Sequence, residues 1–405
     1  MESTTTNNQA TTKLSPLKPL SPKQQQLKRQ ALAFCRQHLR DDKTALFVIT
    51  GDAGTGKSVV LSSLFNDLQS ASQQQPADCL YQTDNHLLVN HPEMLKIYKQ
   101  IAADFPYLRK KDFAKPTPFI NQMAKTQTMA DITLVDEAHL LLTKPDRYNQ
   151  FRQNNQLTEI IKHSHVVILV FDPDQVLKMK SYWNQQMLQQ ILKTHTHQIY
   201  HLDQQFRVAA NTSVLHWIDG FAKQRKLLPL PQDSNYDFRI FSDANQLYQT
   251  LKQRDRQTHL ARLVATADFP YKLDGKTYYV TTNHFKVPWD KNMDPNIPWA
   301  ERPETINEVG SIYTIQGFDL NYVGVILGSS VSFDPAKKRL LIRPEYYQDH
   351  EAFKRRADLT DPKKILQIQQ KIILNSINVL MKRGVRGLYL YACDPLLHQA
   401  LAELS

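Results

Sequence analysis

Four short runs of apolar residues in the first half of the chain are separated by stretches compatible with helices. They are Ala45–Thr50, Asp78–Gln82, Ile132–Val135 and Val166–Phe171. A continuous apolar run of this length is typical of a strand that is buried on both faces. Strands that alternate with helices indicate a doubly wound α/β sheet. We therefore predict an α/β domain in this half of the chain.

Five later apolar runs predict a second α/β domain, with the boundary near Asp203. They are Gln198–Leu202, Phe238–Phe241, Arg262–Ala265, Tyr322–Leu327 and Leu388–Tyr391. Before the first strand, Pro22–Leu39 has the apolar spacing of a helix with one buried face, capped by Ser21. Residues 1–19 are polar and lack an apolar period, which predicts a disordered tail. The expected organisation is therefore a tail (1–19), a first domain (20–204) and a second domain (205–405).

Composition and charge narrow the class of protein. Of the 405 residues 41% are apolar, enough to build cores, so general disorder is excluded. The formal net charge is +11, and residues 337–386 hold 13 Lys/Arg against 5 Asp/Glu, a net charge of about +8. Such a basic stretch indicates an anionic partner, most often nucleic acid. A solvated helical surface is the alternative interpretation of the charge alone.

The three cysteines, Cys35, Cys79 and Cys393, are too few and too scattered for a disulfide framework or a zinc site. They are typical of free thiols in a reducing compartment. The sequence has no run of 18 apolar residues and its polar N-terminus lacks the apolar core of a signal peptide. We therefore expect a soluble, cytoplasmic protein without a membrane partner.

The most specific motif directly follows the first predicted strand and opens the predicted helix Val59–Leu68. It is a Walker A loop that consists of Gly51, Asp52, Ala53, Gly54, Thr55, Gly56, Lys57 and Ser58. In this context, backbone N–H groups and the helix N-terminus point at phosphates. Lys57 would reach the β- and γ-phosphates and the Ser58 hydroxyl would bind Mg²⁺. The motif predicts that the protein binds ATP and Mg²⁺.

The strand Ile132–Val135 ends in two carboxylates, Asp136 and Glu137. Asp136 would hold Mg²⁺ through its water shell, and Glu137 would take the proton from the attacking water. An ordinary strand end is the alternative, which the Walker A loop some 80 residues earlier makes weaker. The tetrapeptide Asp-Glu-Ala-His at 136–139 suggests a superfamily-2 RNA helicase, but the later motifs of that superfamily are missing.

The next segments resemble superfamily-1 helicases. Val170–Gln175 is similar to their motif III, which implies that Gln175 senses the γ-phosphate, although Phe171 stands where that family usually has glycine. Leu20–Gln24 looks like the upstream motif that reads adenine, which implies that Gln24 contacts the base.

Two segments of the second half look like motifs IV and VI of the same superfamily. The first, Gln205-Phe206-Arg207, implies that Phe206 stacks on adenine and that Arg207 reaches the γ-phosphate. The second, Val379–Gly384, implies that Arg383 is a second arginine finger, although Lys382 replaces the usual threonine. Because both arginines lie in the second domain, domain closure would gate hydrolysis.

A third segment, Tyr313–Asp319, looks like motif V, which implies that Gln316, Gly317 and Asp319 belong to the nucleotide site. Asp319 stands where a glutamate usually binds the ribose.

More narrowly, residues 20–395 resemble a bacterial family related to the helicase-like domain of group 3 Schlafen proteins. The supporting stretches are Gln205–Arg207, Trp217–Asp219, Ala261–Ala265, Val287–Trp289, Val309–Gly328 and Arg383–Gly384. The resemblance implies two tandem RecA-like P-loop NTPase domains with mostly parallel sheets. It also implies a helicase-like, Mg²⁺-dependent ATPase that acts on single-stranded DNA or RNA.

Candidate nucleic-acid contacts are Asn85, His86, Trp289, Trp299 and Tyr313. Aromatic rings would serve as stacking platforms, though packing in a core is the more usual use of a tryptophan. The large inserted domains of processive helicases are missing, so duplex unwinding is not expected. The alternative function is an ATP-operated switch or effector module that binds a protein partner, for example in phage defence.

Overall fold

The structure is a computed structural model that describes residues 9–52, 54–183, 185–203, 212–272, 274–290 and 297–404. The chain divides into two units, a first unit of Ala10–Gln205 and a second unit built from Phe206–Ser405. Each unit is described by itself.

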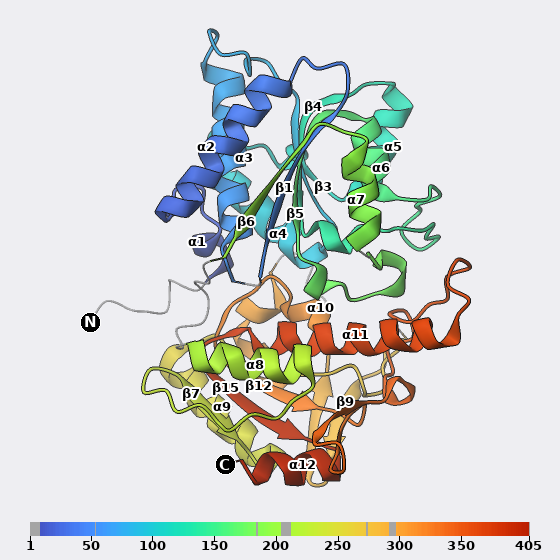
Figure 1. The fold of residues 1–405 in the computed structure, drawn as a ribbon. Coiled ribbons are helices and arrows are strands. Elements are labelled where there is room, and N and C mark those ends of the chain that lie inside the picture. The colour runs from blue at the N-terminus through green and yellow to red at the C-terminus, as the bar shows by residue number, and fades with distance from the viewer. Residues whose placement is uncertain are drawn as a thin grey trace. The chain divides into compact units, whose positions relative to one another are not determined.

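The first unit is built on a six-stranded sheet with the order β3-β2-β4-β5-β1-β6 (Figure 1). All of its neighbouring strands are parallel. Its strands are β1 (Ala45–Gly51), β2 (Asn85–Val89), β3 (Phe113–Ala114), β4 (Ala130–Asp136), β5 (Ser164–Phe171) and β6 (His197–Leu202). The two longest central strands, β4 and β5, are almost fully buried, which explains their unbroken apolar sequence.

Helices cover both faces of this sheet, with α2 and α3 on one side and α5, α6 and α7 on the other (Figure 1). Ser21 caps α2 through a reciprocal capping box with Gln24, as the Ser-Pro start of the helix predicts. The α-helices are α1 (Ala10–Lys13), α2 (Pro22–His38), α3 (Lys57–Gln74), α4 (Pro92–Asp104), α5 (Pro116–Thr126), α6 (Gln156–Lys162) and α7 (Gln185–Lys193). The 3-10 helices are η2 (Lys110–Asp112), η3 (Ala138–Leu140), η4 (Pro173–Gln175) and η5 (Met179–Ser181).

Three sequence-based expectations for this unit differ from the structure. The run Asp78–Gln82 is a series of turns, because the Asp78 carboxylate accepts from the Leu80 N–H and Gln82 has a positive φ. The strand follows three residues later, as β2. The run Gln198–Leu202 lies in β6, which pairs with β1 of the first sheet and not with the second set of strands.

The segment after residue 9 was expected to be part of a disordered tail. Instead it contains α1, and the side chains of Ala10 and Leu14 are buried. The Ser62 hydroxyl of α3 donates a 2.6 Å hydrogen bond to the Leu14 carbonyl oxygen. Two buried apolar side chains and one hydrogen bond therefore anchor this mostly polar segment to the first unit.

The second unit contains a seven-stranded sheet with the order β7-β15-β12-β8-β11-β10-β9, in which only β9 and β10 are antiparallel. Its strands are β7 (Asp237–Ile240), β8 (Ala261–Ala265), β9 (Tyr278–Thr282), β10 (Phe285–Trp289), β11 (Val309–Gly310), β12 (Leu320–Leu327) and β15 (Gly384–Ala392). A separate antiparallel hairpin consists of β13 (Val331–Asp334) and β14 (Arg339–Ile342).

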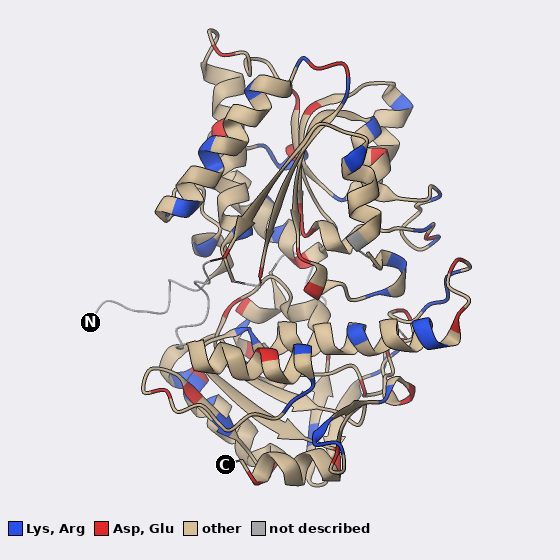
Figure 2. Ribbon diagram, viewed as in Figure 1, with Lys and Arg blue, Asp and Glu red and all other residues tan. Residues whose placement is uncertain are grey.

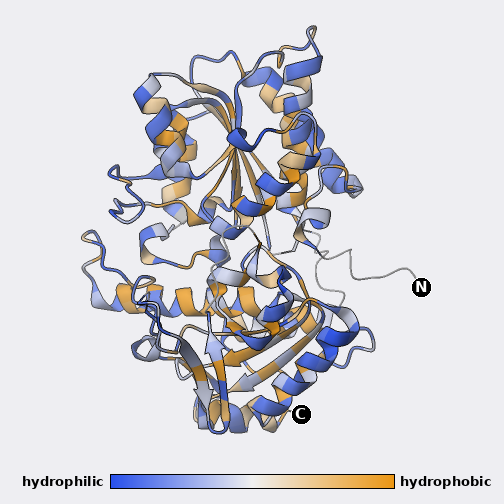
Figure 3. Ribbon diagram, turned by 180° about the vertical axis from the view of Figure 1, so that it is seen from behind, coloured by the Kyte–Doolittle hydropathy of each residue, from blue (hydrophilic) through white to orange (hydrophobic). Residues whose placement is uncertain are grey.

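The α-helices of the second unit are α8 (Thr212–Gln224), α9 (Ala244–Thr258), α10 (Ile312–Ile315), α11 (Pro362–Met381) and α12 (Pro395–Ala402). Its 3-10 helices are η6 (Trp299–Glu301), η7 (Pro303–Asn307) and η8 (Pro344–Tyr346). In both units the central strands carry the most hydrophobic sequence, with polar residues on the outer helices and loops (Figure 3).

The fold class is therefore the predicted one, α/β with two tandem RecA-like units and mostly parallel sheets. Among the described residues, no helix combines the length and the hydrophobicity that crossing a bilayer requires.

Candidate functional site

The loop between β1 and α3 has glycine with a positive φ at three described positions. Gly51 has φ 151°, Gly54 has φ 90° and Gly56 has φ 82°. A Cβ atom on Gly51 would lie 2.4 Å from the Leu202 carbonyl oxygen, and one on Gly56 would lie 2.3 Å from the Gln24 Nε2 atom. Both glycines are therefore required by sterics and by backbone conformation, as in a loop whose backbone must approach a ligand closely. Ala53 lies outside the described residues.

The N-terminus of α3 has the features of an anion site. Its N-cap residue is Gly56, which makes no side-chain cap hydrogen bond among the described residues. The first backbone N–H groups of a helix lack intrahelical acceptors and carry a partial positive charge. A phosphate would satisfy both features, so the loop and the helix start fit a nucleotide phosphate chain.

Lys57 is the first residue of α3, and its side chain is almost completely buried. Its Nζ atom donates to the Gly51 carbonyl oxygen at 2.6 Å and to the Asp52 carbonyl oxygen at 2.8 Å. The Asp172 Oδ2 atom lies 3.6 Å from the same ammonium. The ammonium therefore lies against the backbone of the loop, where it would contact a phosphate that the loop binds.

Ser58 and Asp136 are joined directly, although 78 residues separate them in the sequence. The Ser58 hydroxyl donates to Asp136 Oδ1 at 3.1 Å, and the Tyr98 hydroxyl donates to Asp136 Oδ2 at 2.6 Å. Burial, with the neighbouring charge of Glu137, raises the pKa of Asp136 above its usual range. A bound cation would favour the ionised carboxylate, and the hydroxyl and carboxylate are oxygen ligands of the kind that Mg²⁺ prefers.

Glu137 follows the end of β4 in the left-handed backbone region, with φ 51°. Its backbone N–H donates to Asp136 Oδ1 at 3.0 Å. Its Oε2 atom lies 3.0 Å from Nε2 of the fully buried His139, in η3. Strained backbone at a non-glycine residue is common where a catalytic side chain must be aimed, and one oxygen of this carboxylate faces the His139 ring.

Asp172 connects the predicted sensor glutamine to the loop lysine. The Gln175 Nε2 atom in η4 donates to Asp172 Oδ2 at 2.7 Å. The same oxygen lies 3.6 Å from Lys57 Nζ, and both Gln175 and Asp172 are buried. One oxygen of Asp172 therefore lies between Lys57 and Gln175.

Gln24 lies against the phosphate loop. Its Nε2 atom donates to the Thr55 carbonyl oxygen at 3.1 Å, and its Oε1 atom accepts from the Ser21 N–H at 3.0 Å. These contacts tie the start of α2 to the loop. Contact between Gln24 and a base stays a prediction.

Sheet topology explains why these residues meet. In a parallel sheet the carboxyl ends of all strands lie at one edge, where ligands of α/β proteins bind. Thr50 of β1 pairs with Phe171 of β5, and Val135 of β4 pairs with Leu169 of β5. The segments that follow β1, β4 and β5 therefore emerge side by side at that edge. The described residues of the Walker A loop lie there, together with Asp136, Glu137 and Gln175.

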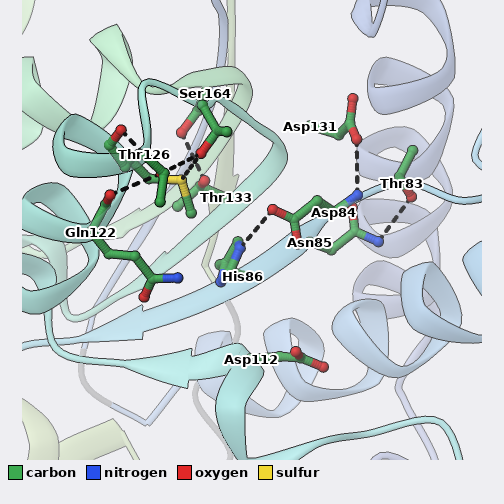
Figure 4. Close-up of polar contacts among 12 residues, drawn as sticks. Thr83, Asp84, Asn85, His86, Asp112, Gln122, Thr126, Asp131, Thr133 and Ser164 are labelled. Atoms are coloured by element: carbon green, nitrogen blue, oxygen red, sulfur yellow. Dashed lines mark hydrogen bonds and ion pairs between the residues drawn. The ribbon is translucent and has the colours of Figure 1, made fainter.

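The proposed nucleic-acid contacts Asn85 and His86 lie in the wrong place for that role. They begin β2 and do not follow it, and Val89 is the residue that pairs with Asp136. Asn85 is therefore four residues, about 13 Å, back along the strand. It donates to Thr83 Oγ1, and His86 pairs with Asp84 at 3.0 Å (Figure 4). The sequence prediction placed the strand too early and so missed the residues that follow it.

The residues at the carboxyl end of β2 are Asn90 and His91. The Asn90 Nδ2 atom donates to the Leu140 carbonyl oxygen at 2.8 Å, and His91 caps α4 by accepting from the Met94 N–H. The structure also adds Tyr98 on α4. No local sequence signal marks Tyr98, because its contact with Asp136 depends on tertiary packing. Helix α4 lies against β2 and β3, and Asp136 ends β4, which pairs with β2.

The second unit carries the other described residues of the predicted nucleotide site. Gly317 has φ 90°, and both Gln316 and Asp319 are buried. Arg383 is also buried, with Nε donating to the Val379 carbonyl oxygen and Nη1 to the Phe318 carbonyl oxygen. Their roles stay predictions. Phe206 and Arg207 lie outside the described residues.

The predicted stacking tryptophans are packing residues. Trp289 is 3% exposed and Trp299 is 2% exposed, so neither offers a face to a base. The Trp299 Nε1 atom donates to Glu308 Oε2 at 3.1 Å, and its ring fills the space beside Gly310. Tyr313 is partly exposed, and its hydroxyl donates to Asp349. Large aromatic side chains stabilise this unit mainly through burial.

Two sequence comparisons match most of the chain. Residues 44–394 match the sequence profile of the Schlafen group 3 DNA/RNA helicase domain. A Saccharomyces cerevisiae protein, described as uncharacterized protein YPL245W, is 44% identical over 429 aligned residues, which cover 98% of this chain and 94% of that protein. This relative comes from a yeast, so it gives no support to the expected bacterial family.

Solved structures resemble the chain more distantly. The Pif1 helicase from Candida albicans is 12% identical, with a TM-score of 0.35 over 96% of this chain and 100% of that chain. AMPPCP-bound DnaA from Aquifex aeolicus is also 12% identical, with a TM-score of 0.27 over 54% of this chain and 57% of that chain. Scores this low carry no weight for function, so the assignment rests on the sequence matches.

Proposed function

The chain belongs to the family of Schlafen group 3 DNA/RNA helicase domains, and from this premise we propose that it is an ATP-hydrolysing, helicase-like motor. Its nucleotide is ATP with Mg²⁺, and its polymer is single-stranded DNA or RNA. The family description supports the helicase-like class. The chemistry at the carboxyl edge of the first sheet supports hydrolysis.

The observation that carries the proposal is the 3.1 Å hydrogen bond between the Ser58 hydroxyl and Asp136 Oδ1. Two motifs with independent sequence signatures meet in one group of oxygen ligands beside an uncapped helix N-terminus. If Asp136 only ended a strand, nothing would require its carboxylate to contact the Walker A serine.

In the proposed mechanism, the α3 N-terminus and Lys57 would bind the phosphate chain, and Ser58 and Asp136 would hold Mg²⁺. Tyr98 orients Asp136 through its 2.6 Å hydrogen bond. Bound ATP with Mg²⁺ supplies the phosphoryl group that is transferred to water. Glu137 would accept the proton of the attacking water.

Gln175 is the proposed γ-phosphate sensor, because Asp172 couples it to Lys57. Gln24 and Phe206 are the proposed adenine contacts, and Asp319, with Gln316 and Gly317, the proposed ribose contact. Arg207 and Arg383 are the proposed arginine fingers, which raise phosphoryl-transfer rates by about 10³–10⁵ in related systems.

Arg383 must exchange partners to act as a finger, since its guanidinium now donates to two carbonyl oxygens of its own unit. That exchange would make hydrolysis conditional on domain closure. The free thiols Cys35, Cys79 and Cys393 support a proposed cytoplasmic location, because such thiols persist in reducing compartments.

The experiment is the steady-state ATPase rate of the full chain with no polymer, single-stranded DNA, single-stranded RNA and duplex, measured side by side. The proposal expects a basal rate that one of the single strands raises at least severalfold. A basal rate that no polymer changes would overturn the motor. Nucleotide-dependent capture of a protein in that case would favour the switch or effector module.

A further inference from the structure

The β13–β14 hairpin carries exposed Lys and Arg residues, and so does the segment that begins with the last residues of α8, more than 100 residues earlier in the sequence (Figure 2). The Leu340 N–H of β14 donates to the Arg225 carbonyl oxygen at 2.8 Å, which fixes the two segments side by side. We call this the hairpin surface, and its cations are Lys223, Arg225, Lys226, Lys337, Lys338 and Arg339. All are exposed except Arg225, which is partly exposed.

The hairpin surface rests on a fixed support. Leu340 and Ile342 alternate with exposed residues along β14 and are buried. Gln370 of α11 joins the two segments, because its Oε1 atom accepts from Arg225 Nη2 at 3.0 Å and its Nε2 atom donates to the Ile342 carbonyl oxygen at 3.1 Å. The backbone that carries the cations is therefore ordered before any partner binds, which lowers the entropy cost of binding.

Few carboxylates neutralise this surface. Asp334, the cross-strand neighbour of Arg339, pairs with Lys337 at 3.6 Å. Asp219 is shared between Lys223 at 3.5 Å and Lys382 at 2.6 Å.

The other cations of the hairpin surface, Arg225, Lys226, Lys338 and Arg339, have no ion pair among the described residues. Burial and the nearby charge of Arg339 lower the pKa of the Arg225 guanidinium. Gathered like charges repel one another, and a bound polyanion would relieve that repulsion.

We propose that the hairpin surface binds the phosphodiester backbone of single-stranded nucleic acid. The inference rests on the proposed function, since the family acts on DNA or RNA, and it names where one stretch of the strand is held. Lys and Arg side chains contact phosphates without a pocket and without reading sequence.

The test uses the full chain with three cations replaced, Lys226→Gln, Lys338→Gln and Arg339→Gln. The matched control replaces three exposed cations elsewhere in the second unit, Arg256→Gln, Lys272→Gln and Lys276→Gln, so that both proteins lose the same charge. Fluorescence anisotropy with labelled oligo(U) and oligo(dT) gives the affinity of each protein at several salt concentrations.

Each phosphate contact adds about 0.7 to the slope of log affinity against log salt for a single strand. The hairpin variant should therefore lose about 2 from that slope and bind on the order of 10–100-fold more weakly at low salt. The control should keep the slope of the unmodified chain. A single Lys338→Glu variant should weaken binding more than Lys338→Gln, and an unchanged polymer-free ATPase rate should show that the variants are folded.

The outcomes separate the two proposals. Equal slopes for the hairpin and control variants, with tight binding by the unmodified chain, would overturn this inference and leave the motor standing. No nucleic-acid binding by the unmodified chain would overturn both. Displacement of the oligonucleotide by poly-glutamate at equal charge concentration would assign the surface to an acidic protein instead.

Discussion

The Ser58 hydroxyl donates a 3.1 Å hydrogen bond to Asp136 Oδ1, and Tyr98 donates to the other oxygen of the same carboxylate. The carboxylate is buried, so its orientation is set by these two donors and by the Glu137 N–H. A group held in this way is prepared to bind a cation without reorganising.

Ser58→Ala should weaken Mg²⁺-dependent turnover while leaving the fold intact. The change removes one oxygen ligand and one donor to Asp136, so the Mg²⁺ concentration for half-maximal ATPase rate should rise on the order of tenfold or more. Mg²⁺ titration of the ATPase rate measures this. Ser63→Ala, in the same helix but outside the loop, is the control, and an equal shift in both variants would refute the assigned role.

Lys57→Ala should abolish tight ATP binding and hydrolysis together. The Lys57 ammonium donates to the Gly51 and Asp52 carbonyl oxygens, so its removal takes a positive charge away from the loop backbone. Titration with a fluorescent ATP analogue tests the loss. Lys28→Ala, which removes an ion pair with Asp67 at 2.7 Å on the neighbouring helix, should bind normally. Near-normal binding by Lys57→Ala would contradict the phosphate-binding role of the loop.

Asp290→Asn should change how stability depends on pH. Burial, helped by the charge of Glu308 and opposed by a hydrogen bond from Ser311, raises the pKa of Asp290 to about 6. The unfolded value is about 3.9, so the folded state binds the proton more tightly. The stabilisation is complete below about pH 4 and is lost as the pH rises through about 6.

The amide cannot ionise, so the free energy of unfolding of Asp290→Asn should fall less from pH 4.5 to pH 7.5 than that of the unmodified chain. The two decreases should differ by an amount on the order of 1–3 kcal/mol. Urea unfolding at the two pH values gives both free energies of unfolding. A constant difference between the two proteins at both pH values would show that Asp290 is not the group that titrates.

The sequence predicts the centre of the first sheet well because β4 and β5 are buried on both faces. Their continuous apolar runs predict buried strands. The two Walker motifs were recognised partly because each comes directly after such a strand. The run Asp78–Gln82 failed because its apolar residues are the side chains of a turn, whose Asp78 carboxylate binds the Leu80 N–H. A short apolar run in the sequence cannot distinguish a buried strand from a turn with apolar side chains. Because the strand was predicted too early, Asn85 and His86 were wrongly expected to follow it.

The net charge of a sequence segment predicted the basic surface less well than the apolar pattern predicted the strands. In the basic stretch 337–386, several cations are used inside the second unit. Arg356 pairs with Asp358 at 2.8 Å, Lys382 pairs with Asp219 at 2.6 Å, and Arg343 pairs with Asp394 at 2.7 Å. Counting charges gives no information about these pairs. The tertiary structure instead joins Lys337–Arg339 to the segment after α8, which the sequence stretch does not include.

The central claim is that the first unit hydrolyses ATP with Glu137 as the base. Glu137→Gln keeps the size of the side chain but cannot accept the proton. The decisive measurement is the ATPase rate of Glu137→Gln beside its affinity for a fluorescent ATP analogue. The account predicts unchanged affinity with turnover reduced at least roughly 100-fold. A normal rate in this variant would contradict it.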